Sequence, residues 1–177
     1  MHKDRILYLN KCIDEESVQP IIEKIININI EDDEKDEKEK NYERKPISLI
    51  INSYGGTIYD GFALISVVER SKTPIHTYVY GKAMSMGLII AVCGHKRYAS
   101  KLATFMYHGG LGGVWGNFEY IKNYSNEYER IQKISDSLLL SKTKIKPDKL
   151  KDIRKRQKDW FISAEEALKL GIIDEII

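Results

Sequence analysis

The sequence predicts an α/β fold with a largely parallel sheet, because strand-like and helix-like segments alternate along the chain. A near-continuous apolar run at residues 47–52 (ISLIIN) is typical of a strand buried on both faces. At residues 58–69 the apolar side chains instead recur with helical spacing. The glycine-containing turn at residues 53–56 joins the two, so strand, turn and helix follow one another directly.

Two further strands and a helix are predicted in the first half of the chain. Residues 5–9 (RILYL) indicate a first strand, and a helix follows it. We expect Ser17 to cap this helix, which would put Pro20 in the first turn, where its missing N–H does no harm. Another strand covers residues 75–80 and is expected to end at Gly81.

The second half contains the longest predicted helix. It spans about residues 118–142 and has apolar side chains at helical spacing. A shorter apolar helix is predicted at residues 86–93, and a Ser-x-x-Glu capping box at residues 163–166 opens a helix that stops at Gly171. Two short strands complete the pattern, at residues 97–99 and 103–107.

Composition indicates an ordinary globular protein. With 177 residues, 42% hydrophobic and 31% charged, the chain suits one domain over residues 1–177 and is too apolar to be wholly disordered. The 28 Lys and Arg nearly balance 26 Asp and Glu, so no attraction to nucleic acid or an anionic membrane is expected. The longest apolar run, residues 87–93, is far below the ~20 residues of a membrane span, and the segment MHKDRILYLN is not a secretory signal. Cys12 and Cys93 are too few for a disulfide scaffold, so a cytoplasmic location is expected.

Charge is distributed unevenly. Residues 31–40 contain seven acids and three bases, and no apolar side chain follows until Tyr42, so we interpret about residues 31–45 as an acidic surface loop. Residues 142–158 contain nine bases and two acids but no interleaved aromatic side chains, which argues against a nucleic-acid site. A solvated helix face is the simpler interpretation, since this stretch has a sparse apolar stripe at Ile145, Leu150 and Ile153.

Ser85 is the first candidate for chemistry, because it lies in a strand-to-helix turn, Gly-Lys-Ala-Met-Ser-Met-Gly. The free N–H groups at the start of a helix stabilise negative charge, which suits a nucleophile whose intermediate is an oxyanion. The pattern resembles a nucleophile elbow, with Ala-x-Ser-x-Gly in place of Gly-x-Ser-x-Gly. Taken alone, a simple capping serine is the favoured interpretation.

Two other places are candidates. Gly55 and Gly56 end a buried strand and could bring a backbone N–H close to a ligand, although a plain tight turn explains them equally well. His108 ends a strand beside several glycines and could act as a general base, or it could be an ordinary surface histidine. Its spacing from Cys93 and His95 fits no zinc pattern, so no metal or cofactor is expected.

Four motifs in order resemble those of the ClpP family, the proteolytic subunits of Clp proteases. Each alone is a weak signal, whereas together they cover the chain from about residue 3 to its end, apart from the acidic segment. The motifs are INSYGG (residues 51–56), GKAMSMG (81–87), FMYHGGLGGVWG (105–116) and DWFISAEEALKLGIIDEI (159–176).

The resemblance implies a serine endopeptidase that hydrolyses peptides or unfolded proteins. Ser85 would be the nucleophile, His108 the base, and Asp159 the acid that orients the imidazole. The backbone N–H groups of Gly56 and Met86 would form the oxyanion hole.

The resemblance also implies architecture and assembly. The expected fold is the ClpP/crotonase-type fold of repeated ββα units, with residues 118–142 projecting as a handle helix. Heptameric rings, which could be stacked through these handles, would enclose the active sites. Extended substrate would pair with a glycine-rich strand at residues 111–116, and the implied substrate-binding residues are Gly55, Leu111, Gly112 and Gly113.

This sequence departs from the family pattern in several places. Tyr54 replaces a proline, Met84 an alanine, and Gly109-Gly110 a Gln-Pro pair, but no catalytic group is lost. The chain begins at about the first strand, without the family's axial N-terminal segment, so docking of an AAA+ unfoldase is less supported than peptidase activity. If the alignment after His108 differs locally, Asp152 is the alternative acid.

Three other functions remain open. A non-catalytic paralogue could join a Clp ring without cleaving substrates, although such paralogues usually lose members of the triad. A crotonase-type acyl-CoA enzyme shares the fold but does not need a Ser-His-Asp set. A signal-peptide peptidase would use a serine–lysine dyad, for which Lys82 is the nominal candidate.

Overall fold

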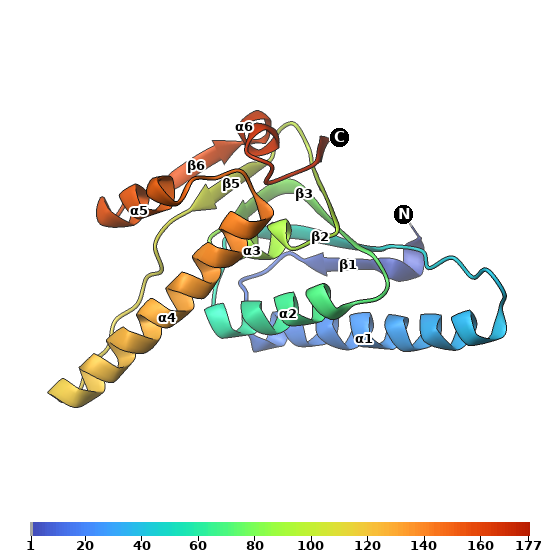
Figure 1. Cartoon of the computed structure of the whole chain (residues 1–177), viewed down its shortest axis with the longest axis horizontal. Helices are drawn as coiled ribbons and strands as arrows, with labels where there is room; N and C mark the ends of the chain where they lie inside the picture. Colours follow the sequence, from blue (N-terminus) through green and yellow to red (C-terminus); the bar gives the residue numbers. More distant parts are fainter. Residues whose placement is uncertain (1) are drawn as a thin grey trace.

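One mixed sheet and six α-helices make up the fold in a computed structural model that describes residues 2–177. The strands are β1 (Ile6–Leu9), β2 (Ile47–Ser53), β3 (Ile75–Met84), β4 (Lys96–Ala99), β5 (Thr104–Tyr107), β6 (Trp160–Ser163) and β7 (Glu175–Ile176). The helices are α1 (Glu15–Lys38), α2 (Ile58–Arg70), α3 (Met86–Val92), α4 (Phe118–Lys142), α5 (Pro147–Lys155) and α6 (Ala164–Lys169), with a 3-10 turn at Lys3–Arg5. The predicted α/β class is therefore confirmed (Figure 1).

The sheet has the order β1-β2-β3-β4-β7, and β5 lies beside the far end of β3. All pairs are parallel except β5 with β6, which is antiparallel. The expected end of the third strand at Gly81 is wrong, because β3 continues to Met84. Its first half pairs with β4, and its second half gains a new partner in β5, from Lys82 opposite Thr104 to Met84 opposite Met106.

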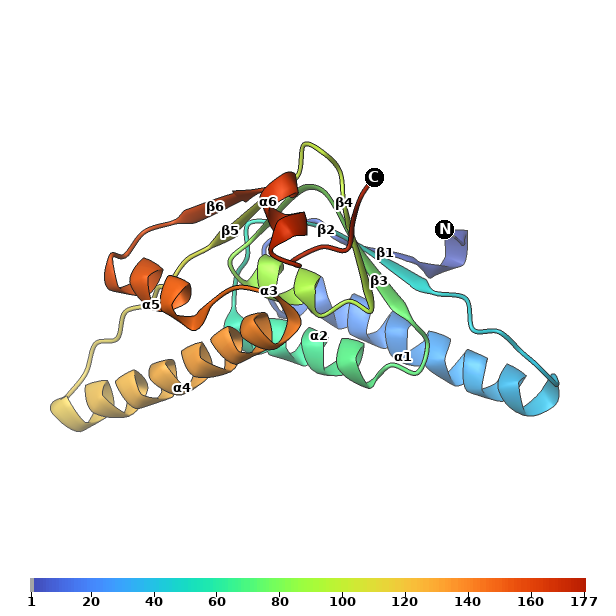
Figure 2. The same ribbon diagram turned by 45° about the horizontal axis from the view of Figure 1, so that its top comes forward.

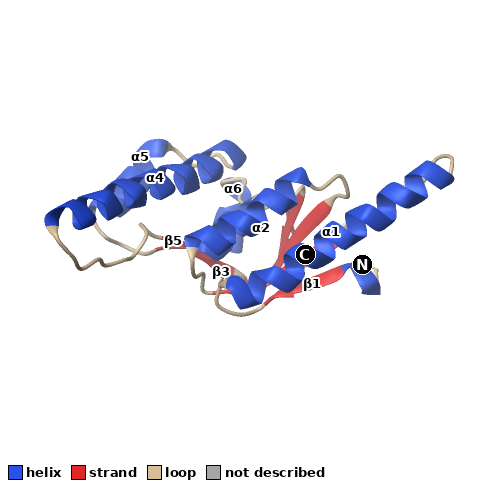
Figure 3. Ribbon diagram, turned by 90° about the horizontal axis from the view of Figure 1, so that it is seen from below, coloured by secondary structure: helices blue, strands red, loops and turns tan. Residues whose placement is uncertain are grey.

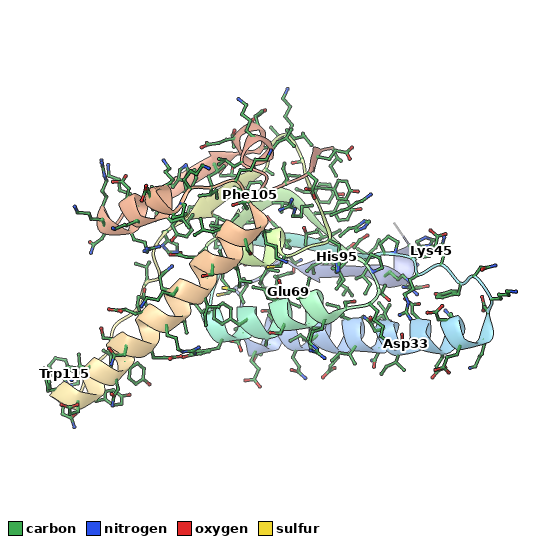
Figure 4. The ribbon with its side chains drawn as sticks, in the orientation of Figure 1. Asp33, Lys45, Glu69, His95, Phe105 and Trp115 are labelled. Carbon is green, nitrogen blue, oxygen red and sulfur yellow. The ribbon has the colours of Figure 1, made fainter. Side chains whose placement is uncertain are left out.

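Helices α1 and α2 lie side by side on one face of the sheet (Figures 1 and 3). Their inward apolar side chains meet those of the central strands and of α3, whose residues are all buried. Phe105 of β5 is fully buried in this core, near the centre of the molecule (Figure 4). The largest fully buried side chains are Phe105, Leu9, Ile13, Ile25, Ile47, Leu49, Ile51, Leu64, Ile75, Leu88, Ile90 and Leu139.

The start of α1 differs from the expectation. Asp14 is the N-cap, and its carboxylate accepts a hydrogen bond from the N–H of Ser17 at 2.9 Å. The hydroxyl of Ser17 accepts one from the N–H of Asp14 at 3.0 Å, so the two residues form a reciprocal capping box. Pro20 consequently lies inside the helix rather than in its first turn.

The acidic segment is a helix for most of its length, so the predicted loop at about residues 31–45 is wrong in its first half. Helix α1 runs to Lys38 because Asp32 faces inward and is fully buried. Its carboxylate accepts hydrogen bonds from Arg5, from Tyr42 Oη at 2.7 Å and from Thr73 Oγ1 at 2.6 Å. A charged side chain thus faces the interior of the protein here, where we expected only apolar side chains.

Helix α4 has the bounds predicted from the sequence and projects from the rest of the molecule (Figures 1 and 2). Its buried side chains, which begin at Ile131, lie in its C-terminal half, near α3. The N-terminal half is exposed, and Trp115 lies at its tip, 96% exposed (Figure 4). The glycine-rich strand expected at residues 111–116 is not formed in this single chain.

Helix α5 confirms the amphipathic interpretation of the basic segment. Leu150 and Ile153 are buried on one face of this helix, and Ile145 is buried just before it. Within residues 2–177, no helix combines the length and apolar character needed to cross a membrane.

Candidate active site

Ser85 stands between β3 and α3 in a rare backbone conformation, with φ 53° and ψ −123°. A non-glycine residue in such a region costs about 1–3 kcal/mol, which the surrounding structure must offset. Here the N–H of Ser85 donates to the carbonyl oxygen of Met106 at 2.8 Å, which fixes the turn to the neighbouring strand. The turn therefore has the sharp strand-to-helix geometry that exposes a nucleophile.

His108 follows the last residue of β5 directly, as Ser85 follows that of β3. Because β3 and β5 are parallel neighbours, the two side chains emerge at the same edge of the sheet. Nε2 of His108 lies 2.7 Å from Oγ of Ser85, and the imidazole side chain is only 15% exposed. The serine hydroxyl and an imidazole nitrogen are thus in hydrogen-bond contact.

Asp159 lies on the other side of the imidazole. It directly precedes β6, in which Trp160 pairs with Tyr107 of β5, so the sheet register puts it beside His108. Oδ1 of Asp159 is 3.7 Å from Nδ1 of His108, and the carboxylate is 54% exposed. This distance is longer than a hydrogen bond. The alternative acid, Asp152, instead pairs with Arg156 on α5 at 2.7 Å.

The two glycines of the β2–α2 turn have different neighbours. Gly55 has φ 105°, and a methyl group added there would come within 2.7 Å of Cβ of Ser85, so only glycine allows this approach. Its N–H donates to Oγ of Ser53 at 3.1 Å. Gly56 has φ 154° and forms an isolated β-bridge with Ile13. The two hydrogen bonds of this bridge run from the N–H of Ile13 to the carbonyl oxygen of Gly55, and from the N–H of Thr57 to the carbonyl oxygen of Ile13. The N–H of Gly56 is therefore not used in the bridge.

Met86 is the first residue of α3, so its N–H has no acceptor within that helix. It follows Ser85 directly and lies at the positive end of the helix. The N–H of Gly56 is thus not used in the bridge to Ile13, and the N–H of Met86 is not used within α3. The donors of an oxyanion hole must likewise not be engaged in such backbone hydrogen bonds.

A small pocket of about 30 Å³ opens beside Ser85 and His108. Its apolar wall comes from Ile58, Met86 and Ile89, and its other side is more polar. The complete lining is Ile58, Ser85, Met86, Ile89, Tyr107, His108, Gly110, Gln132 and Ser135. A side chain that entered this pocket would lie next to the serine hydroxyl.

Lys82, the nominal base of a serine–lysine dyad, is engaged elsewhere. Its Nζ lies 4.2 Å from the centre of the ring of Tyr54, in a cation–π contact. The partner of the Ser85 hydroxyl is His108. The geometry therefore favours a serine–histidine pair over a serine–lysine pair.

The implied substrate-binding residues fall into two groups. Gly55 contacts the turn at Ser85, as described above. Leu111, Gly112 and Gly113 lie on the exposed segment between β5 and α4, and Leu111 is 83% exposed. The structure thus leaves the backbone of this segment accessible beside the site.

Sequence reasoning missed two polar residues on the inner side of α4, Gln132 and Asp136. The carbonyl oxygen of the Gln132 side chain accepts from the N–H of Gly110 at 2.8 Å, two residues after His108. The carboxylate of Asp136 accepts a hydrogen bond at 2.7 Å from Oη of Tyr107, the residue directly before His108. The signal was present as polar residues, with Ser135, inside the apolar stripe of the helix.

The model of the Clp protease family covers residues 1–177. This match agrees with the mixed α/β fold and supports a ClpP-like peptidase from a family that typically forms oligomeric rings. The chain belongs to the Clp protease family.

Proposed function

We propose that the protein is a serine endopeptidase that cleaves peptides or unfolded polypeptides with Ser85, His108 and Asp159. The observation that carries the proposal is the 2.7 Å contact between Oγ of Ser85 and Nε2 of His108 at a strained strand-to-helix turn. A strained nucleophile in contact with an imidazole is the arrangement of acyl-transfer enzymes.

The reaction would begin with attack of Oγ of Ser85 on the peptide carbonyl carbon. Nε2 of His108 accepts the hydroxyl proton and later delivers it to the leaving amine, so an acyl-enzyme remains. Water, activated by the same nitrogen, then hydrolyses the ester. Asp159 stabilises the imidazolium that forms in both steps, and its 3.7 Å separation would shorten in the working enzyme.

The negative charge of the tetrahedral intermediate would lie near the start of α3. The N–H groups of Gly56 and Met86 are the proposed donors, and the dipole of the helix adds to their effect. Loss of one such donor typically costs about 3–4 kcal/mol of transition-state stabilisation. The close packing of the two turns supports this role, since a methyl group on Gly55 would come within 3.2 Å of the backbone nitrogen of Met86.

Assembly into rings would enclose this site. The exposed half of α4 and the segment before it present unpartnered apolar side chains, among them Leu111, Trp115 and Phe118. A projecting helix with such side chains favours burial against other chains. Because the family typically forms oligomeric rings, we propose that these side chains are covered in rings, heptameric and stacked through α4 as the resemblance implies, and that substrate reaches the sites as extended chain.

Labelling with a fluorophosphonate, read by intact mass at several protein concentrations, tests the proposal. We expect one adduct per chain and none on Ser85→Ala, because only an activated serine reacts rapidly. Labelling that rises with oligomer content would link activation to assembly. If the fully oligomeric protein acquires no adduct, the peptidase assignment is wrong and a non-catalytic ring subunit is the better description.

A further inference from the structure

Asp136 is a carboxylate on the buried side of α4, and only 9% of the residue is exposed. Its Oδ1 accepts hydrogen bonds from Tyr107 Oη at 2.7 Å and from Nε2 of Gln132 at 2.9 Å. Its Oδ2 forms an ion pair with Nη1 of Arg154 on α5. Three side chains from three elements therefore converge on one buried carboxylate.

Hydrogen bonds to Asp136 and Gln132 hold the chain on both sides of His108. Tyr107, which is buried, precedes the histidine and is fixed through its hydroxyl. Gly110 follows it and is fixed through its N–H, which donates to Oε1 of Gln132 at 2.8 Å. Because Gln132 also donates to Asp136, one network holds both flanks of His108 against α4.

The glycine pair after His108 allows this close approach. A methyl group on Gly110 would come within 2.5 Å of the hydroxyl oxygen of Tyr128 on α4, and one on Gly109 within 3.2 Å of Cγ of Arg154. The segment is thus packed tightly on α4 and α5, although its sequence is flexible.

Arg154 extends the network toward the carboxylate side of the site. It lies in α5, five residues before Asp159, and also donates to Tyr107 Oη at 3.3 Å. The segments that bear His108 and Asp159 are therefore both tied to α4 through Asp136.

We propose that Gln132 and Asp136 are positioning residues that hold the His108 imidazole in line with Ser85. Neither residue contacts the serine, so both act through Tyr107, Gly110 and Arg154. This inference rests on the proposed peptidase function and adds to it a requirement for α4. A displacement of about 1 Å in a reacting group can cost on the order of 10²-fold in rate.

The test compares folded variants by kinetics. Tyr107→Phe removes one hydroxyl and keeps the packing, Gln132→Ala removes both bonds of the amide, and Asp136→Asn keeps the shape but loses the charge. Ser137→Ala is the matched control, since its exposed hydroxyl bonds only to its own helix, at Lys133. Melting temperature and oligomer size are measured for each variant.

We expect kcat and the rate of fluorophosphonate labelling to fall about 10- to 100-fold in Gln132→Ala and in Asp136→Asn. KM should stay unchanged in Asp136→Asn, because Asp136 does not line the pocket. Tyr107→Phe should show a smaller fall in the same direction. The double variant Gln132→Glu with Asp136→Asn keeps an acceptor for the N–H of Gly110 and reverses the amide and the carboxylate of the Gln132–Asp136 pair, so it should recover part of the rate lost in Gln132→Ala. Ser137→Ala should label at the wild-type rate.

Two outcomes overturn the inference while the proposed function stands. The first is wild-type labelling rates in assembled Tyr107→Phe and Gln132→Ala, even where the melting temperature falls. The second is a rate for the double variant no better than for Gln132→Ala, since the Gly110 bond would then not matter. Absence of labelling in the wild type overturns the function and the inference together.

Discussion

Oγ of Ser85 and Nε2 of His108 are 2.7 Å apart, although the residues are separated by 23 positions in the sequence. Each follows the last residue of a strand, and these strands are parallel neighbours with Met84 opposite Met106. The carboxyl ends of parallel strands meet at one edge of a sheet, where sites in α/β proteins commonly form. The second half of β3, beyond Gly81, is the part of the sheet that brings the two residues together.

The acid of the site provides the first prediction. Asp159→Asn should lower kcat by up to about 10³–10⁴-fold, because the imidazole loses the carboxylate that orients it and stabilises its charged form. Steady-state cleavage of a fluorogenic peptide measures this loss. Asp152→Asn is the control, since Asp152 pairs with Arg156 and not with His108, and it should leave kcat unchanged. The reverse pattern would make Asp152 the functional acid.

The close approach of the glycine turn gives a second prediction. Gly55→Ala should inactivate the enzyme and destabilise it, because the new methyl group would lie 2.7 Å from Cβ of Ser85 at φ 105°. The strain should exceed about 1 kcal/mol, and each kcal/mol lowers Tm by about 2–4 °C in a chain of this size. Gly113→Ala is the stability control, since its methyl group would meet no atom within 4 Å. Equal melting curves for the two variants would contradict the turn geometry.

The order and type of most elements could be predicted from the sequence, because apolar periodicity is a local property. The helix over residues 118–142 was predicted to its ends. The acidic half of α1 was missed because the prediction weighed apolar periodicity and not helix propensity, although Glu and Lys are good helix formers. Glu34 and Lys38 also form an i,i+4 ion pair. The contacts of Asp32 with Arg5, Tyr42 and Thr73 across the fold add support that no local pattern encodes.

Ser85 and His108 could be proposed from their places at strand ends, but their contact depends on the register of β3 with β5, which no local pattern encodes. Asp159 needed the family resemblance, since an aspartate before a strand carries no signal of its own. Gln132 and Asp136 were missed because a helix stripe is identified by its apolar members. The polar residues inside that stripe can be seen in the sequence, but their partners, Tyr107 and Gly110, can be identified only in the packed fold.

The apolar wall of the pocket provides a third prediction, on substrate preference. Ile58, Met86 and Ile89 form this wall beside Ser85, so a charged side chain that entered would lose water without gaining a polar partner there. Peptides with leucine before the cleaved bond should exceed those with aspartate by about 10-fold or more in kcat/KM. Ile58→Ala removes part of this wall and should narrow the ratio, whereas Ile22→Ala, a core-packing change on α1, should not. A preference for aspartate in the wild type would contradict this prediction.

The buried pair of Arg5 and Asp32 provides the last prediction, on stability against pH. Burial alone would raise the pKa of Asp32, but hydrogen bonds from Arg5, Thr73 and Tyr42 outweigh it and hold the pKa well below its usual range. The unfolded chain therefore binds a proton more readily than the folded one, so this stabilisation is complete above about pH 5 and is lost as pH falls below about 4.

Asp32→Asn should lower the free energy of unfolding at pH 7 by about 3–5 kcal/mol, because it leaves Arg5 without its counter-charge. Urea unfolding from pH 7 to pH 3 measures both effects, and the difference between wild type and variant should shrink toward the acid end. Glu31→Gln, at an exposed position next to Asp32 on the same helix, should show neither effect. A pH-independent difference for Asp32→Asn would mean that its shape, not its charge, stabilises the end of α1.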